Sequence, residues 1–280
     1  MPRKYLVCKN FRLALCKKPL VMGILNITPD SFCDGGKHLS HETAYKRALK
    51  MQAEGVDIID IGGESTRPAA EEVSVKEELD RVIPVLRRFI KKAKVPISVD
   101  TKKPEVAQQA LKYGASIIND ITGLLGNKRM ADVIASYDAA VVIMHIKGTP
   151  RTMQNAPKYK NLLKEISATL KKGATIAIKA GIGKNSIIID PGIGFGKTIS
   201  HNLKIINRLG KFKKLGFPVL VGISRKSFMG KILNLDVADR LTPTIACNTI
   251  AMQNGADIIR VHDVAEAIKT RDIVYEIANS

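Results

Sequence analysis

The sequence lacks tryptophan, has only 5% aromatic residues and contains four cysteines in 280 residues. Cys8, Cys16, Cys33 and Cys247 form no C-x-x-C pair and show no zinc-ligand spacing, so neither a disulfide framework nor a zinc site is expected. The simplest interpretation is a cytoplasmic protein with reduced thiols. No apolar run approaches the roughly 18 residues that a membrane-spanning helix needs, so we expect no membrane partner.

Acidic residues are also scarce, because 45 Lys and Arg face only 26 Asp and Glu, and the net charge is +19. Such an excess could indicate nucleic-acid binding, since phosphate affinity rises with the number of basic contacts. However, no series of aromatic residues interleaves with the basic stretches 87–94 and 208–214, as stacking on bases would require. We therefore expect no nucleic-acid partner, and interpret the charge as a basic surface that at most gathers small anionic substrates.

What is abundant is a repeating pattern of a short apolar run, a polar turn and ten or more residues with helical periodicity. Continuous apolar runs are typical of parallel strands buried on both faces. The predicted strands are 21–27, 56–61, 96–100, 115–120, 139–145, 186–190, 218–224 and 256–262. The predicted helices are 41–55, 74–93, 103–113, 127–136, 160–181, 199–210, 238–254 and 264–278.

Eight strands alternating with eight helices predict an α/β fold, a (β/α)8 TIM barrel that residues 1–280 form as a single domain. Gly55, Gly114 and Gly255 are expected to end helices in the left-handed conformation. An N-terminal β-hairpin with its turn at Lys9 and Asn10 would plug the bottom of the barrel. The alternative is an open doubly wound sheet, which would need a nucleotide-binding fingerprint near the first strand, and the sequence has none.

Each predicted strand ends on a polar residue that packing explains poorly. In chain order these residues are Asn26, Asp60, Asp100, Asn119, His145, Asp190, Ser224 and His262. A barrel brings all of these strand ends to one rim, where barrel enzymes carry their active sites. Carboxylates and carboxamides suit a flat heterocycle with several N–H donors. The cations opposing them suit phosphate or carboxylate, and are Arg67, Lys197, Arg225, Lys226, Arg260 and His262.

Two long loops, 26–36 and 62–74, follow strands directly and would lie over this rim. A third segment, DPGIGFGKT (190–198), is similar to a Walker A loop, but Pro191 occupies the position of its first glycine. We expect the glycines of these loops to let the backbone approach a ligand, or to let the loops move as lids.

Nine motifs occur in a specific order and spacing. They are GILNITPDSFCDGG (23–36), DIIDIGGESTRP (57–68), SVDT (98–101), INDITG (118–123), MH (144–145) with GTPRTMQ (148–154), DPGIGFGKT (190–198), GISRKSFMG (222–230) and RVHDV (260–264). Through them the chain resembles the dihydropteroate synthases along almost its full length, a family of (β/α)8 barrels. The resemblance implies a transferase of folate biosynthesis, in which 4-aminobenzoate displaces diphosphate from 6-hydroxymethyl-7,8-dihydropterin diphosphate to give 7,8-dihydropteroate.

The resemblance also implies roles for matching residues. Those that would bind the pterin are Asp100, Asn119, Ile121, Met144, Asp190, Phe195, Gly222 and Lys226. Those around the aminobenzoate would be Phe32, Thr66, Arg67, Pro68, Arg225 and Ser227. Asn26, Arg260 and His262 would take the diphosphate, with Mg²⁺ as cofactor on Asn26. The catalytic set would be Asp34, Asp100, Lys226, Arg260 and His262.

The implied chemistry is a dissociative displacement, because a methylene on the pterin ring can lose diphosphate and leave a ring-stabilised cation. Asp34 and Asp100 would favour that positive charge, whereas Mg²⁺, Arg260 and His262 would favour the departing negative charge. A helix starting near Ser227 would offer N–H groups to the benzoate carboxylate. The alternative is a pterin-binding methyltransferase domain, which would not need ESTRP or SRKSF. Family analogy implies a homodimer.

Overall fold

The computed structural model describes residues 5–15, 18–27, 36–65 and 70–280, with the backbone alone for 36–40. Its parallel strands are β3 (Leu20–Asn26), β4 (Ile58–Gly62), β5 (Ile97–Asp100), β6 (Ile117–Asp120), β7 (Ala140–Met144), β8 (Ile187–Asp190), β9 (Leu220–Val221) and β10 (Ile258–Val261). They pair in the order β8-β7-β6-β5-β4-β3-β10-β9, and a parallel bridge from Ile189 to Val219 joins β8 to the residue before β9. The sheet therefore closes into the predicted barrel.

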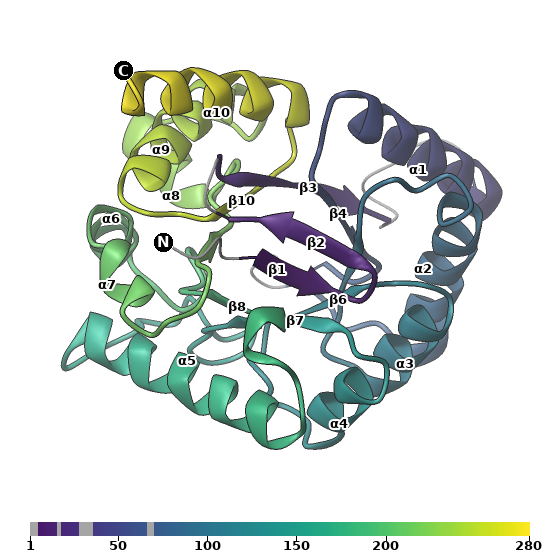
Figure 1. The fold of residues 1–280 in the computed structure, drawn as a ribbon. Coiled ribbons are helices and arrows are strands. Elements are labelled where there is room, and N and C mark those ends of the chain that lie inside the picture. The colour runs from purple at the N-terminus through teal and green to yellow at the C-terminus, as the bar shows by residue number, and fades with distance from the viewer. Residues whose placement is uncertain (1–4, 16–17, 28–35, 66–69) are drawn as a thin grey trace.

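The helices surround the strands as an outer ring (Figure 1). The α-helices are α1 (Gly36–Ala53), α2 (Val75–Phe89), α3 (Pro104–Lys112), α4 (Arg129–Ala135), α5 (Leu162–Lys179), α6 (Ile199–Asn207), α7 (Gly210–Lys213), α8 (Ser227–Leu233), α9 (Leu241–Gln253) and α10 (Val264–Ala278). Two 3₁₀ turns, η2 (Lys184–Ser186) and η3 (Ala238–Arg240), precede β8 and α9.

Some of the expected element boundaries were wrong. Strand β9 is Leu220–Val221 rather than 218–224, and α2 ends at Phe89 rather than at residue 93. Helix α1 begins at Gly36, five residues before the predicted start. The prediction missed this first part because the mainly polar stretch 37–41 has no apolar periodicity that would indicate a helix. The helix predicted to reach residue 210 ends at Asn207, and the short α7 that follows was not predicted. The three glycine predictions are confirmed, since Gly55, Gly114 and Gly255 have φ angles of 90°, 106° and 100°.

The strands sort their side chains by alternation, because successive residues point to opposite faces of a sheet. On β4, Ile59 and Ile61 pack in the large core between sheet and helices, whereas Ile58 belongs to a second apolar cluster inside the barrel. Asp60 lies two residues beyond Ile58 and is therefore on the inner face. The other strands repeat this arrangement, with Ile117 below Asn119 and Ile188 below Asp190. The interior thus has an apolar lower layer and a polar upper layer.

The predicted N-terminal hairpin is confirmed and covers the lower end of the barrel. Strands β1 (Tyr5–Cys8) and β2 (Phe11–Ala14) pair antiparallel, with Lys9 at φ 51° in the turn. Leu6 and Cys8 are fully buried and pack on the apolar lower layer of the barrel. Figure 1 views the molecule from this end, where the two short strands cross in front of the barrel.

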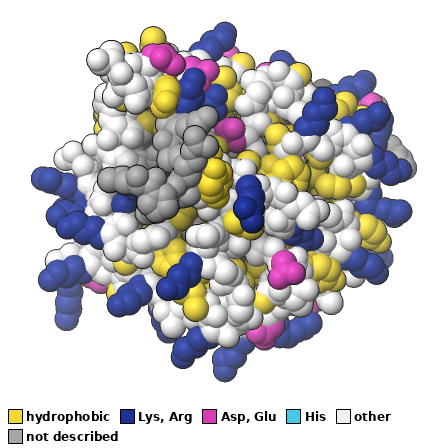
Figure 2. Space-filling view, viewed as in Figure 1, with side chains coloured by type: hydrophobic (Ala, Val, Ile, Leu, Met, Phe, Trp, Pro, Cys, Tyr) yellow, Lys and Arg dark blue, Asp and Glu magenta, His cyan; other side chains and the backbone are white. Residues whose placement is uncertain are grey.

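The basic residues are dispersed over the face of the molecule that carries the N-terminal hairpin. Figure 2 shows Lys and Arg side chains spread around this face rather than gathered into one stripe. The phenylalanines within the two most basic stretches, Phe89 and Phe212, are fully buried in the core. Within the described ranges, no helix is both long and apolar enough to span a bilayer.

Candidate active site at the upper rim of the barrel

Four of the predicted rim residues form one hydrogen-bonded network. The guanidinium of Arg260 donates from Nε to Asp60 Oδ2 at 2.6 Å and from Nη2 to Asp100 Oδ2 at 2.9 Å. Asn119 Nδ2 donates to the same Asp60 oxygen at 3.0 Å. These residues come from β10, β4, β5 and β6, so the barrel brings together side chains up to 200 positions apart. The network is a fixed layer of donors and acceptors facing the mouth of the barrel.

Two buried carboxyl groups at the rim, Asp100 and Asp190, have raised pKa values. Burial raises the pKa of Asp100 to about 7, against the opposing effect of Arg260. Burial also raises the pKa of Asp190 to about 6, although the Gly192 N–H, Lys226, Lys197 and Arg260 all oppose the rise. At neutral pH both groups therefore lie close to their titration points. Such carboxyls can exchange protons with a ligand, which is a common property of functional sites.

Lys226 supplies a half-buried cation next to an apolar wall. Its Nζ lies 4.2 Å from the centroid of the Phe195 ring, a cation–π distance. Burial, followed by the charge of Arg260, lowers the pKa of Lys226 to about 8. Phe195 belongs to a small buried cluster at the upper rim whose other members are Ile121, Met144 and Met153. This cluster is an apolar surface that could contact the face of an aromatic ring.

The opposite part of the rim carries the residues predicted for anions. Ser224 Oγ and His262 Nδ1 are 3.0 Å apart, and Arg47 donates to the His262 carbonyl oxygen at 2.8 Å. Asn26 ends β3 half-buried, and its Oδ1 lies 3.4 Å from where a Cβ on Gly62 would stand. Gly222 faces Arg260 at ordinary contact distance, so a larger residue there would narrow the mouth.

Arg225 and Ser227 begin the segment predicted to meet the aminobenzoate. Arg225 has a left-handed φ of 56° and donates to both carboxylate oxygens of Asp263 at 2.9 Å. Helix α8 starts at Ser227 as expected, with Lys226 at its N-cap. The two-point ion pair orients the Arg225 guanidinium at the rim, because the fork of donors matches a carboxylate.

Five of the predicted residues, Phe32, Asp34, Thr66, Arg67 and Pro68, lie outside the described residues. The flanks of the second loop are described, and ion pairs hold them. Lys102 Nζ lies 3.1 Å from Glu64 and 2.9 Å from Glu72, and Lys103 pairs with Glu64 and with the buried Glu78. Arg81 donates to the Gly63 carbonyl oxygen at 2.7 Å.

The segment 190–198 packs on the β7 end rather than forming a phosphate loop. Gly192 has a φ of 69°, and a Cβ there would lie 2.0 Å from the His145 carbonyl oxygen. Gly194 donates from its N–H to Asn202 Oδ1 at 2.8 Å and accepts from Gln154 Nε2 at 2.7 Å. The loop therefore uses its glycines for close packing on the protein's own backbone, which differs from the two predicted uses, approach to a ligand and movement as a lid.

Sequence reasoning gave no role to some residues that the geometry makes important. The sequence identifies Asp60 only as one of eight polar strand ends, yet in the structure Asp60 accepts hydrogen bonds from both Arg260 and Asn119. Lys197 was noted only as a cation, yet its side chain is 2% exposed and contacts His145. The inward position of Asp60 in β4 was a usable signal. Nothing local in the sequence indicates the Lys197 contact.

Comparisons with known proteins agree with this geometry. The family model described as "Pterin binding enzyme" matches residues 22–262. The dihydropteroate synthase of Escherichia coli (strain K12) is 48% identical over 256 residues, which cover 91% of this chain and 90% of the relative. The dihydropteroate synthase of Bacillus subtilis (strain 168) is 46% identical over 273 residues, covering 97% and 93%.

Solved structures give the same result. A Yersinia pestis dihydropteroate synthase with a sulfonamide drug complex superposes with a TM-score of 0.93 at 41% identity, covering 99% of this chain and 100% of that one. A Xanthomonas albilineans dihydropteroate synthase with 4-aminobenzoic acid has a TM-score of 0.93 at 40% identity, covering 99% of each chain. The likeness extends over the whole barrel and includes its rim, and the chain belongs to the dihydropteroate synthase family of pterin-binding enzymes.

Proposed function

We propose that this chain joins 6-hydroxymethyl-7,8-dihydropterin diphosphate to 4-aminobenzoate, releasing diphosphate and 7,8-dihydropteroate, with its rim residues in the roles that the family resemblance implies. The observation that carries the proposal is the network in which the buried Asp60, Asp100 and Asn119 meet the half-buried Arg260. A buried layer that is this polar serves a polar ligand better than it serves packing, because buried charges are expensive unless paired.

The described part of the rim offers polar and apolar partners for a pterin ring. Its N–H groups need acceptors and its ring nitrogens and carbonyl need donors. Asp100 and Asp190 supply carboxyl groups, and Asn119 and Lys226 supply donors. The ring face would lie against the wall formed by Ile121, Met144 and Phe195.

The diphosphate is proposed to meet Asn26, Arg260 and His262. Arg260 links the two halves of the pocket, because its guanidinium already pairs with Asp60 and Asp100 and keeps these carboxylates compensated. It would therefore stabilise negative charge on the diphosphate while also orienting the pterin end. Ser224 Oγ lies 3.0 Å from His262 Nδ1, and this contact orients the imidazole.

The donor set fits a magnesium ion that arrives with the substrate. In the described part of the chain, no three His, Cys, Asp or Glu side chains are grouped so that they could hold a metal ion. Mg²⁺ favours oxygen ligands and retained waters, so one carboxamide oxygen such as that of Asn26 would suffice when phosphate oxygens provide the rest. Bound there, Mg²⁺ would neutralise charge on the leaving diphosphate.

The bond to diphosphate is proposed to break before the new C–N bond forms. Asp100, and Asp34 from the first loop, would favour positive charge on the pterin methylene, as preorganised charge often supplies most of the barrier reduction. The aminobenzoate would meet Arg225 and Ser227 from the described part. Phe32, Thr66, Arg67 and Pro68 would complete its surroundings from outside the described residues.

The test is diphosphate release measured with and without 4-aminobenzoate. The proposal expects release that depends on 4-aminobenzoate and equals the dihydropteroate formed. Methyl transfer without diphosphate release would support the alternative of a pterin-binding methyltransferase domain instead. The curated relatives reported above are dihydropteroate synthases matched over nine tenths of their length, which supports the first outcome.

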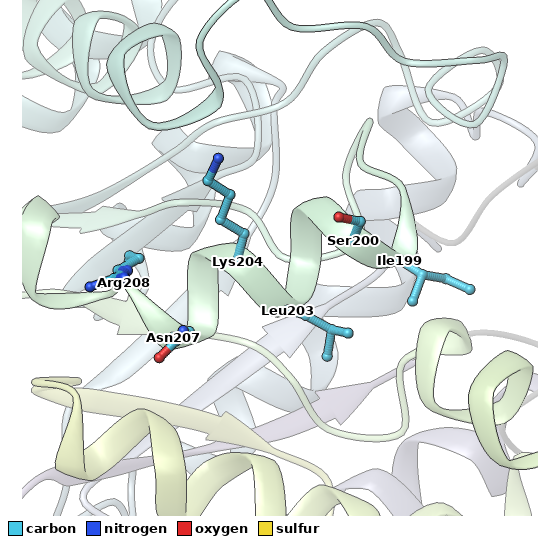
Figure 3. A pocket seen from close by; sticks show the side chains of 6 residues that line it. All are labelled: Ile199, Ser200, Leu203, Lys204, Asn207 and Arg208. Carbon is cyan, nitrogen blue, oxygen red and sulfur yellow. The ribbon is translucent and has the colours of Figure 1, made fainter.

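The chain is also proposed to act as a homodimer in the cytoplasm. Six large apolar side chains are at least one-third exposed on α6, α8, α9 and the turn before η3, namely Ile199, Leu203, Ile232, Leu233, Val237 and Ile250. Figure 3 shows an open pocket along α6, lined by Leu203 and Ile199 together with polar residues of the same helix. Exposed apolar groups of this kind commonly mark an interface. Cys8 and Cys247 have free thiols, which suits a reducing compartment.

A further inference from the structure

One buried cation of the rim has no part in the proposed function. Lys197 lies near the end of the 190–198 segment and is 2% exposed. Its Nζ lies 2.8 Å from the Phe195 carbonyl oxygen, 3.0 Å from His145 Nδ1 and 3.4 Å from the His145 carbonyl oxygen. Lysines are almost never fully buried unless paired. Yet among the described residues the hydrogen bonds of this ammonium go to His145 and Phe195, and none goes to a carboxylate.

The contact with His145 fixes the state of the imidazole. Burial, and then the Lys197 charge, lower the pKa of His145 to about 3, so the ring stays neutral under ordinary conditions. While Lys197 is protonated it can only donate, so Nδ1 accepts and the proton of the ring is on Nε2. The ammonium therefore joins the end of β7 to the segment that follows β8 through three acceptors, two of them on His145.

The same contacts lead to the pterin wall. Lys197 donates to the carbonyl oxygen of Phe195, and the Lys226 Nζ lies 4.2 Å from the centroid of the Phe195 ring. The backbone of Gly192 lies directly on the carbonyl of His145, so there is little room for the segment to shift toward β7. A displacement of Phe195 would therefore move the surface against which Lys226 and the pterin ring are proposed to lie.

Charge adds a second link. The groups that act on Asp190 are the Gly192 N–H, Lys226, Lys197 and Arg260. Those that act on Lys197 are Asp190, whose charge opposes the lowering of its pKa, and Lys226, whose charge adds to it. Burial still dominates and lowers the pKa of Lys197 to about 7, so the lysine is cationic on the acidic side of neutrality, where Asp190 titrates.

We propose that Lys197 is a positioning residue for pterin binding. It holds Phe195 in place under Lys226, and its ammonium adds to the positive charge that acts on Asp190. This inference rests on the proposed function, because it concerns the pocket assigned above to the pterin. Lys197 itself is not expected to touch the substrate, since its hydrogen bonds are used by His145 and Phe195.

A purely structural role of Lys197 can be distinguished from the proposed role in pterin binding, because other side chains also anchor the 190–198 segment. Gln154 and Asn202 hold Gly194, and Tyr159 donates to the Gly196 carbonyl oxygen at 2.8 Å. Tyr159→Phe removes one such anchor without changing a charge, and is the matched control. Lys197→Met removes both the donor and the charge, Lys197→Gln keeps one donor without charge, and Lys197→Arg keeps the charge.

The experiment measures the pH dependence of pterin diphosphate affinity by calorimetry, together with KM for both substrates. The acid limb is the part of the pH profile in which affinity for pterin diphosphate falls as pH decreases. Lys197→Met is expected to move this limb up by about one pH unit, because Asp190 loses the positive charge of Lys197. It should raise KM for pterin diphosphate about tenfold and leave KM for 4-aminobenzoate within about twofold. Lys197→Arg should restore most of the acid limb, and Tyr159→Phe should leave it where it is.

Two results would overturn the inference. One is a folded Lys197→Met or Lys197→Gln variant whose acid limb superposes on that of the wild type. The other is an equal shift in Tyr159→Phe. If Lys197→Met does not fold, Lys197→Gln and Lys197→Arg alone decide the question, since they differ in charge. The calorimetric readout needs no turnover, so an absence of 4-aminobenzoate-dependent diphosphate release would defeat the proposed function while the Lys197 inference stayed testable.

Discussion

The two ends of the barrel solve the same packing problem in opposite ways. At the lower end, Leu6 and Cys8 of the hairpin complete an apolar layer with Met22, Ile58 and Ile188. At the upper end, the same strands present Asp60, Asp100, Asn119 and Arg260. The lower layer gains stability from burial alone, whereas the upper layer requires each charge to find a partner. The comparison shows which end serves folding and which serves the ligand.

The largest effect on activity is expected at Asp100. Asp100→Asn keeps the shape but removes the negative charge that pairs with Arg260 and that would favour a cationic pterin. We expect kcat/KM to fall by about two to three orders of magnitude, as when a preorganised group of an active site is removed. Steady-state kinetics and circular dichroism would check this. A fall of less than about threefold would show that the upper layer is not catalytic.

Arg260→Met should harm both stability and binding. It leaves Asp60 and Asp100 buried without their shared cation, and breaking a buried pair costs about 3–5 kcal/mol. The loss should be greatest above about pH 7, because the raised pKa of Asp100 lets this carboxyl accept a proton below that value. Chemical denaturation at pH 5 and pH 8 measures the difference. A pH-independent loss would contradict the ion-pair account.

Leu6→Ala tests the lower end. Leu6 is fully buried, so removing its side chain should cost about 2–5 kcal/mol in the free energy of unfolding. Because the hairpin lies at the other end of the barrel, KM for both substrates should stay within about twofold of the wild type. Denaturant unfolding and kinetics on the same preparation provide the two numbers. A tenfold rise in either KM would erase the distinction between the ends.

The smallest effect on turnover is expected on the outer surface. Leu203→Glu places a charge among the exposed apolar residues of α6. We expect the mass in solution to fall from that of a dimer to that of a monomer, with kcat changed by less than about threefold, because the site lies inside one barrel. Sedimentation equilibrium measures the mass. A wild type that is already monomeric would refute the proposed homodimer.

The lower end could be predicted from sequence almost completely. Apolar runs such as 115–120 give the strands, whereas it is the structure that shows Ile117 inside the barrel and Ile118 outside it. The hairpin turn at Lys9 was also predictable, because local sequence determines a turn. Packing of apolar side chains follows from periodicity, so a single sequence carries most of the information.

The upper end was predictable only in outline. Asp60 and Arg260 were both recognisable as strand-end residues, but their ion pair joins positions 200 apart and depends on closure of the barrel. The contact of Lys197 with His145 likewise requires two loops to be placed side by side. Roles for Asn26 and Arg225 came from the family resemblance, because no periodic pattern in the sequence indicates the function of a single polar residue.

The most direct test of the comparison is one variant of the upper layer measured in two ways. Asp190→Asn keeps an acceptor for the Gly192 N–H and removes a buried carboxyl whose folded pKa lies above its ordinary value. Such a group favours folding at low pH, and this contribution is lost as pH rises from about 4 to about 6. We therefore expect the stability of the variant relative to wild type to be higher at pH 8 than at pH 4, while calorimetry detects no binding of pterin diphosphate. Unchanged affinity, or an equal loss of stability at both pH values, would contradict the account.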